Sequence, residues 1–319
     1  MAYSEQVLHR ARQRLEQAKA DRERENEQRR LDAYRRFPRL EEIERELRRT
    51  MAKIMQTALR KGEDPRQAIE AIRDENLALQ QERSWILEVE DLDYELPLCS
   101  QCGGSGYVGS VMCECLRELC RQEQKRELTS LLGNGRESFD SFRLDYYPDI
   151  VDGNLGVSPR RLMQSNFNIC RKYAHEFDRN AGNLLFSGAT GLGKTFLSAC
   201  IARTVSDRGH SVVYESAIRM FHDLENEKFR NTSEGQESRK YLDCDLLIID
   251  DLGTEMTTQF TVSALYHVVN SRLMDNRATI ISTNLMPEAM EKRYSPQIAS
   301  RVMGSYRLIK FVGEDIRRR

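Results

Sequence analysis

The stretch GATGLGKT, Gly188–Thr195, constrains the fold of this chain more than any other feature. It follows the apolar run LLF (184–186) and opens a segment that reads as a helix from about Lys194. Glycines at these spacings let backbone N–H groups surround a β-phosphate, while the lysine reaches the β- and γ-phosphate oxygens and the threonine hydroxyl coordinates Mg²⁺. The sequence therefore predicts a strand, a phosphate-binding loop and a helix. The residues expected to contact the nucleotide are Gly188, Ala189, Thr190, Gly191, Leu192, Gly193, Lys194 and Thr195.

From Ser158 onward, short apolar runs that read as strands alternate with helical segments. The strand-like runs are LLF (184–186), VVYE (212–215), LLIID (246–250), TIIST (279–283) and RLIKF (307–311). Strands separated by helices predict a parallel sheet covered on both faces, which is an α/β fold.

Two aspartates end the central strand LLIID. Ligands of such sheets bind beyond the carboxyl ends of the strands. We therefore expect Asp250 to hold Mg²⁺ through water, and Asp251 to orient or deprotonate the water that attacks the γ-phosphate. Without the phosphate loop, a solvent-facing acidic turn would be the better interpretation of this pair.

Two polar residues further along the chain fit the same site. Asn284 directly follows the strand-like run TIIST, where its amide would reach the attacking water or the γ-phosphate. Arg301 lies on a short helix predicted after Pro296, and it would stabilise transition-state charge in a neighbouring subunit. Taken alone, a strand-end turn residue is the better interpretation of Asn284. For Arg301, spacing alone does not separate this role from an ordinary surface arginine.

In this order, the segments resemble AAA+ ATPases, and more narrowly the bacterial replicative helicase loaders of the DnaC/DnaI type. The matching stretches are GATGLGKTFLSACIA, LLIIDDLGTE, ISTNL, IASRV and, upstream, SFDSFRLDYY (138–147). The resemblance covers about residues 95 to 319. It implies that Lys194 and Thr195 contact phosphate and Mg²⁺, that Asp250 and Asp251 form the Walker B pair, that Asn284 is the sensor, and that Arg301 is a finger acting in trans.

The resemblance also sets expectations for rate and assembly. Many hydrolysing relatives carry glutamate where this chain has Asp251, and no C-terminal lid is expected after the fifth strand. An isolated monomer should therefore hydrolyse ATP slowly, and self-association should complete the site. In this family the helix predicted over 216–231 can line a path for single-stranded DNA. Arg219, Lys228 and Arg230 are candidate phosphate contacts there, although a plain amphipathic helix is the better interpretation of each residue taken singly.

A cysteine-rich segment, CSQCGGSGYVGSVMCEC, precedes the α/β pattern. Two close pairs of thiolates separated by a glycine-rich turn suit tetrahedral Zn²⁺, and so small a segment has almost no apolar core of its own. The expected ligands are Cys99, Cys102, Cys113 and Cys115. Cys120 is a substitute candidate one helical turn later, and four unliganded thiols are the plain alternative.

The first third of the chain is highly charged and reads as helices. Leu40, Ile43, Leu47 and Met51 recur at three- and four-residue steps, and a further helix runs to about Val89. The pattern fades in DRERENEQRR, and Asp64 with Pro65 reads as the start of the last helix. A self-packed helical bundle is expected, and its stripe is long enough for a partner protein to cover part of it.

Bulk composition limits the partners and the compartment. The formal net charge is −1, so the overall field does not draw the chain onto nucleic acid, and any DNA contact needs a local basic surface. No signal peptide is recognisable, and no apolar run approaches the roughly 20 residues that span a bilayer. We expect a cytoplasmic protein with no membrane contact, in which the eight cysteines are free thiols or metal ligands.

The sequence as a whole predicts an ATP-dependent loader of a hexameric replicative DNA helicase that binds ATP, Mg²⁺, Zn²⁺ and single-stranded DNA. The expected domains are a helical partner-binding domain (1–92), a zinc module (93–127), a linker (128–157) and the AAA+ ATPase domain (158–319). Two alternatives stay open: a transposition helper ATPase of the IstB type, and an adaptor that ATP switches with little hydrolysis.

Overall fold

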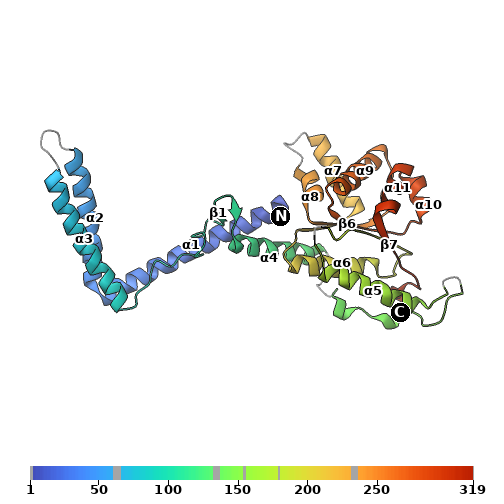
Figure 1. Ribbon diagram of the computed structural model, residues 1–319, viewed down its shortest axis with the longest axis horizontal. Coiled ribbons are helices and arrows are strands. Elements are labelled where there is room, and N and C mark those ends of the chain that lie inside the picture. The colour runs from blue at the N-terminus through green and yellow to red at the C-terminus, as the bar shows by residue number, and fades with distance from the viewer. Residues whose placement is uncertain are drawn as a thin grey trace. The chain divides into compact units, whose positions relative to one another are not determined.

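The computed structural model describes residues 3–59, 66–131, 137–153, 156–178, 180–230 and 236–318 (Figure 1). By contacts, the chain divides into two compact units. One contains Met1–Arg12 and Glu114–Arg319, and the other contains Gln13–Cys113. The predicted Asp64–Pro65 helix start lies outside the described residues.

The unit of residues 13–113 is built on helices. It comprises most of α1 (Glu5–Arg36), together with α2 (Pro38–Leu59), α3 (Arg66–Val89) and a two-stranded antiparallel ribbon of β1 (Tyr107–Val108) and β2 (Val111–Met112). Helices α2 and α3 pack antiparallel, since Arg39 pairs with Glu82 and Thr50 with Asn76. Their core contains Ala33, Leu40, Ile43, Leu79, Ile86 and Tyr94. The expected self-packed helical region is confirmed.

Helix α1 continues through DRERENEQRR, where the apolar pattern gave no support for a helix. Most residues of the segment are the strong helix formers Arg, Glu and Gln, and ion pairs join residues three apart along it, such as Asp21 with Arg24 and Glu27 with Arg30. A charged helix of this kind needs no apolar face over every turn.

The other unit is a five-stranded parallel sheet with the order β4-β5-β6-β3-β7. The strands are β3 (Asn183–Ser187), β4 (Val212–Ser216), β5 (Leu246–Leu252), β6 (Ala278–Thr283) and β7 (Tyr306–Lys310). All five expected strands are present. The α/β fold class is confirmed, with the first strand placed between the fourth and the fifth.

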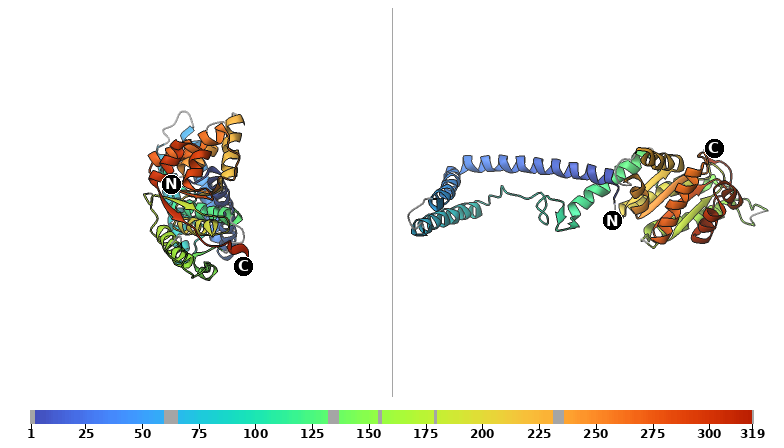
Figure 2. Two further views of the ribbon diagram at one scale, coloured as in Figure 1. Left: turned by 90° about the vertical axis from the view of Figure 1, so that its right-hand side faces the viewer. Right: turned by 90° about the horizontal axis from the view of Figure 1, so that it is seen from above.

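Helices cover both faces of this sheet (Figures 1 and 2). On one face, α5 (Pro159–His175) and α6 (Lys194–Asp207) bury Met163, Cys170 and Leu197 against Leu184, Phe186 and Ile248. On the other face lie α7 (Ala217–Arg230), α8 (Gln236–Asp243), α9 (Gln259–Met274), α10 (Pro287–Arg293) and α11 (Pro296–Ser305). Neighbouring strand residues, such as Leu246 and Leu247, supply opposite faces, as strand geometry requires.

Helix α4 (Glu114–Leu131) closes the edge of the sheet at β4. The Gln124 side-chain carbonyl accepts the Val212 backbone N–H at 2.9 Å, and its amide donates to the Ser206 hydroxyl at 2.6 Å. Arg10 pairs with Glu127, so the first turns of α1 join the same unit. Short 3₁₀ turns η1 (Phe139–Ser141) and η2 (Leu144–Tyr146) precede α5, and η3 (Ile316–Arg318) follows β7. Across the described residues, no helix combines the length and the apolarity that a membrane crossing requires.

Candidate functional site

The phosphate loop joins β3 to α6, as the sequence predicts. Gly193 occupies the N-cap of α6 with φ 91°, a left-handed conformation that glycine adopts without strain. A Cβ atom at Gly188 would lie 2.4 Å from the Phe311 carbonyl oxygen, and one at Gly191 would lie 1.9 Å from Asp315 Oδ1. The glycines are therefore needed both for the backbone conformation and for the close approach of the segment after β7.

Lys194 begins α6, and its side chain folds back over the loop. Its Nζ donates to the carbonyl oxygens of Gly188 at 2.7 Å and Ala189 at 2.8 Å. Burial lowers the pKa of Lys194, while the nearby carboxylates of Asp251 and Asp250 act in the opposite direction. The ammonium group thus lies within electrostatic range of both acidic residues that were predicted to share its site.

Asp250 is buried at the end of β5 and held from two sides. Tyr214 on β4 donates its hydroxyl to Asp250 Oδ2 at 2.7 Å, and Ser282 on β6 donates to Oδ1. Burial, and then the charge of Asp250, raises the pKa of Tyr214 well above its ordinary value, so its hydroxyl stays protonated and donates. Neighbouring strands therefore fix the orientation of this carboxylate.

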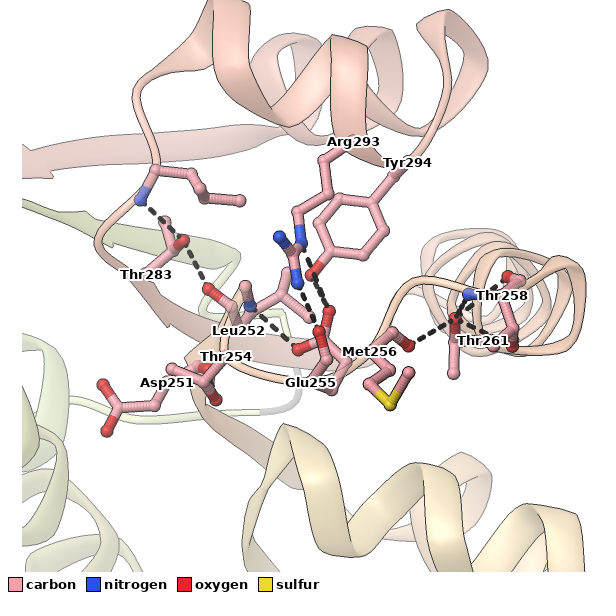
Figure 3. Close-up of polar contacts among 12 residues, drawn as sticks. Asp251, Leu252, Thr254, Glu255, Met256, Thr258, Thr261, Thr283, Arg293 and Tyr294 are labelled. Carbon is pink, nitrogen blue, oxygen red and sulfur yellow. Dashed lines mark hydrogen bonds and ion pairs between the residues drawn. The ribbon is translucent and has the colours of Figure 1, made fainter.

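A bulge re-aims Asp251. Ile249 pairs with Ile281 and Leu252 with Thr283, so β5 contains one more residue than β6 between these pairs. Asp251 has φ 54°, and its backbone N–H donates to the Ser282 hydroxyl at 2.9 Å. Asp251 lies at the surface, and its partly buried carboxylate points away from the contacts that follow it in the chain (Figure 3).

Partial burial and the neighbouring charges shift the pKa of Asp251. Burial, and then Asp250, raises its pKa, while Lys194 and Arg317 lower it. A carboxylate with a raised pKa is a better proton acceptor than an ordinary aspartate, which suits a group that activates water.

The remaining predicted residues of this site are Thr195, Asn284 and Arg301. Thr195 is exposed on the first turn of α6, and Asn284 is exposed directly after β6. Arg301 lies on α11, where its Nε donates to Asn270 Oδ1 at 2.8 Å and its guanidinium lies 4.7 Å from the centre of the Tyr266 ring. Within its own chain, Arg301 is therefore held against α9.

The segment after β7 supplies a cation that sequence reasoning missed. The Ile316 N–H donates to the Gly191 carbonyl at 3.0 Å, and Arg317 pairs with Asp315 at 3.1 Å. The charge of Arg317 acts on both Lys194 and Asp251. Tyr214 and Ser282 were also missed, because one hydroxyl in an apolar strand gives no signal before the strands are paired.

The four predicted cysteines come together. One sulfur from each of Cys99, Cys102, Cys113 and Cys115 lies within 4.8 Å of the others. The Cys99 and Cys113 sulfurs are 3.8 Å apart, and tetrahedral zinc with Zn–S bonds of about 2.3 Å requires about that separation. The backbone N–H of Gly106 donates to Cys102 Sγ at 3.3 Å, as for a thiolate ligand. The cluster could therefore hold a metal, and buried Cys120 is not part of it.

Helix α7 exposes part of the predicted basic surface. Arg219 is 62% exposed beside Glu215, and the Lys228 ammonium lies 5.3 Å from the centre of the Phe260 ring. The side chain of Arg230 is outside the described part. Ile218 is exposed, while Met220, Phe221 and Leu224 form the buried face of this helix.

Comparison with known proteins agrees with this geometry. Residues 168–302 match the family model described as IstB-like ATP binding protein. The matched segment includes the phosphate loop, both aspartates, Asn284 and Arg301.

Several curated proteins that are similar to this chain are named replicative helicase loaders. The chain is 31% identical over 134 residues to the "Replicative helicase loader DnaC" of Escherichia coli strain K12, which is 41% of this chain and 54% of that protein. It is 23% identical over 189 residues to the protein of that name from Buchnera aphidicola of Acyrthosiphon pisum, covering 58% and 73%. The chain thus spans about half the length of the E. coli relative. The resemblance to helicase-loader ATPases is confirmed.

A solved structure titled "Crystal structure of the DnaC helicase loader" is also similar to this chain. The identity is 17%, the TM-score is 0.48, and the match covers 56% of this chain and 98% of the other.

Proposed function

We propose that this protein is an ATP-dependent loader that places a hexameric replicative DNA helicase on DNA during replication initiation, and that it acts in the cytoplasm. The observation that carries the proposal is the 31% identity to a replicative helicase loader, in a chain whose ATP-binding domain matches an ATP-binding family. The chemistry at the carboxyl ends of β3, β5 and β6 supports ATP as the nucleotide.

Each predicted site residue then has a role in hydrolysis. The backbone of the phosphate loop and Lys194 bind the phosphates, while Thr195 and Asp250 hold Mg²⁺, which neutralises charge on the phosphate oxygens. Asp251 accepts a proton from the attacking water, and Asn284 orients that water against the γ-phosphate. Tyr214 and Ser282 keep Asp250 in place.

Arginine supplies the remaining positive charge. In the proposed assembly, Arg301 of one subunit reaches the γ-phosphate bound to its neighbour, so hydrolysis depends on self-association. Arg317 acts within its own subunit, since its charge already reaches Lys194 and Asp251. An isolated subunit lacks one of these cations and hydrolyses ATP slowly.

The rest of the chain binds the partner molecules. The helices of residues 1–92 hold the helicase, and the module of residues 93–127 is stabilised by Zn²⁺ on Cys99, Cys102, Cys113 and Cys115. Residues 128–157 link this module to the ATPase domain of residues 158–319. Single-stranded DNA contacts the exposed basic side chains of α7, among them Arg219.

The first test is complex formation. The full chain is mixed with the replicative helicase of the same organism, with and without ATP, and the products are sized by chromatography with light scattering. A stable large complex is expected. The mixture is then scored for helicase loading on single-stranded DNA, where Lys194→Ala should form the complex but fail to complete loading. Separate elution under every nucleotide condition would contradict the proposal.

The family match also favours a second candidate, a helper ATPase that assembles a transposase on DNA. It predicts that the transposase from the same genome, and not the helicase, co-elutes with the chain. An ATP-switched adaptor predicts ATP-dependent complexes without turnover. Phosphate release by the assembled complex with DNA distinguishes the adaptor from both ATPases.

A further inference from the structure

Glu255 is a buried carboxylate on the loop between β5 and α9, four residues after Asp251. Its side chain is 4% exposed. Oε2 accepts the Gly253 N–H at 2.9 Å, and Oε1 accepts the Tyr294 hydroxyl (Figure 3). Arg293 lies with Nε 3.7 Å from Oε1, and it also donates to the Glu255 backbone carbonyl. We call Gly253, Glu255, Arg293 and Tyr294 the Glu255 cluster.

The members of this cluster depend on one another. A buried carboxylate that loses a partner keeps its desolvation penalty, so removing one contact costs more than one exposed hydrogen bond. Burial, and then the hydrogen bond to Glu255, raises the pKa of Tyr294 far above its ordinary value, so the hydroxyl remains a donor. Gly253 packs closely against Leu285, since a Cβ atom at Gly253 would lie 2.8 Å from Leu285 Cδ1.

The cluster joins two segments that both lead to Arg301. On one side, the loop of residues 251–258 runs from Asp251 into α9, which carries the Asn270 and Tyr266 contacts of Arg301. On the other side, Arg293 and Tyr294 end α10, directly before the Ser295 cap of α11, which carries Arg301 itself. The two helices that position the Arg301 guanidinium, α9 and α11, are therefore each connected by a short segment to the Glu255 cluster.

We infer that Glu255 is a positioning residue, which through Tyr294 and Arg293 fixes α10 and α11 to the Walker B loop and so sets the place of Arg301 in the neighbouring subunit's site. This inference rests on the proposed role of Arg301 in trans. A purely structural role of the cluster would lower the stability of the chain without a specific effect on the arginine that a subunit donates.

The test uses mixed assemblies of full-length chains with helicase and single-stranded DNA. Lys194→Ala subunits cannot bind ATP productively but retain Arg301, and Arg301→Ala subunits bind ATP but donate no arginine. Neither should turn over alone, and mixing them should restore activity. Tyr294→Phe is then added to the Lys194→Ala subunit, where it removes only the hydroxyl that reaches Glu255.

In this donor position, Tyr294→Phe should lower kcat by about tenfold with KM for ATP unchanged, because the site that binds ATP is intact and only the incoming arginine is displaced. The matched control is Tyr241→Phe in the same donor. It removes a comparable bond, from a buried tyrosine to Asp223 at 2.7 Å, between α8 and α7. The control should leave kcat within about twofold.

The outcomes distinguish a failure of the Glu255 inference from a failure of the proposed role of Arg301 in trans. If the parent pair shows no turnover, the arginine in trans is wrong, and the inference fails with it. If the parent pair is active and Tyr294→Phe behaves like Tyr241→Phe, the proposed site stands and the role of Glu255 is overturned. A loss seen with Tyr294→Phe alone supports it.

Discussion

Arg272 on α9 is the largest fully buried side chain among the described residues. Replacing it tests the packing that supports the site. Its Nη1 donates to the carbonyls of Tyr241, Leu242 and Cys244 at 2.8 to 3.1 Å. Its Nη2 and Nε donate to β6, at the Ala278 carbonyl and the Thr279 hydroxyl. The guanidinium therefore caps the end of α8, where the last helical carbonyls have no partner within the helix.

Arg272→Met removes all of these donors and leaves the carbonyls buried. Each unpaired buried acceptor costs about 1–3 kcal/mol, and removing the cost of burying the guanidinium offsets part of the sum. We expect a loss of about 3–5 kcal/mol. For a domain of this size, each kcal/mol corresponds to roughly 2–4 °C, so Tm should fall by roughly 6–20 °C.

Calorimetry on the nucleotide-free chain measures this loss, and hydrogen exchange at β5 and β6 locates it. The control is Arg277→Met, because Arg277 donates to the Asp243 carbonyl of the same loop but is 31% exposed. It should lose less than about 1 kcal/mol. If Arg272→Met costs no more than this control, the reasoning from buried carbonyls is wrong.

Three further predictions concern the site itself. Asp251→Asn should abolish ATP turnover without lowering Tm at pH 7. The folded state raises the pKa of Asp251, so the stability that its protonated form contributes is present at low pH and is lost as pH rises through that pKa. Asparagine also tolerates the φ of 54°. A lower Tm for the variant would refute this sign. Gly191→Ala should weaken ATP binding, measured by calorimetry, by about tenfold or more, because its φ of 76° would strain the phosphate loop and its Cβ would displace the Asp315 carboxylate. Gly182→Ala, where φ is also positive but no atom lies within 4 Å, should bind ATP normally, and equal affinities would contradict the steric argument. The purified chain should contain one zinc ion per molecule by mass spectrometry, and Cys102→Ser should lose it; a metal-free but folded wild type would exclude the zinc assignment.

Local patterns were enough to predict the ATP-binding domain. The five strands lie where the apolar runs predict them, and Ser158, directly before Pro159, caps α5. Such features depend on residues close in the chain, since strand formation and capping are decided within a few residues. The four cysteines were equally readable, because their spacing limits them to one small loop.

Other features could not be read from local patterns. Helix α1 persists through a segment without an apolar stripe, because ion pairs between residues three apart replace apolar burial. Ile218 is exposed because the sheet accepts the face of α7 that presents Met220 and Phe221. For α7, more than one helical face was compatible with the sequence, and tertiary packing chose one.

By itself, the sequence determined a phosphate loop between a strand and a helix, an acidic pair at the end of a buried strand, and a four-cysteine cluster. The tertiary structure alone decided that Tyr214 and Ser282 hold Asp250, and that Tyr294 and Arg293 meet Glu255. These contacts join residues 32 to 39 positions apart. They exist only once parallel strands and their helices have come together, because a buried carboxylate takes its partners from whichever elements pack around it.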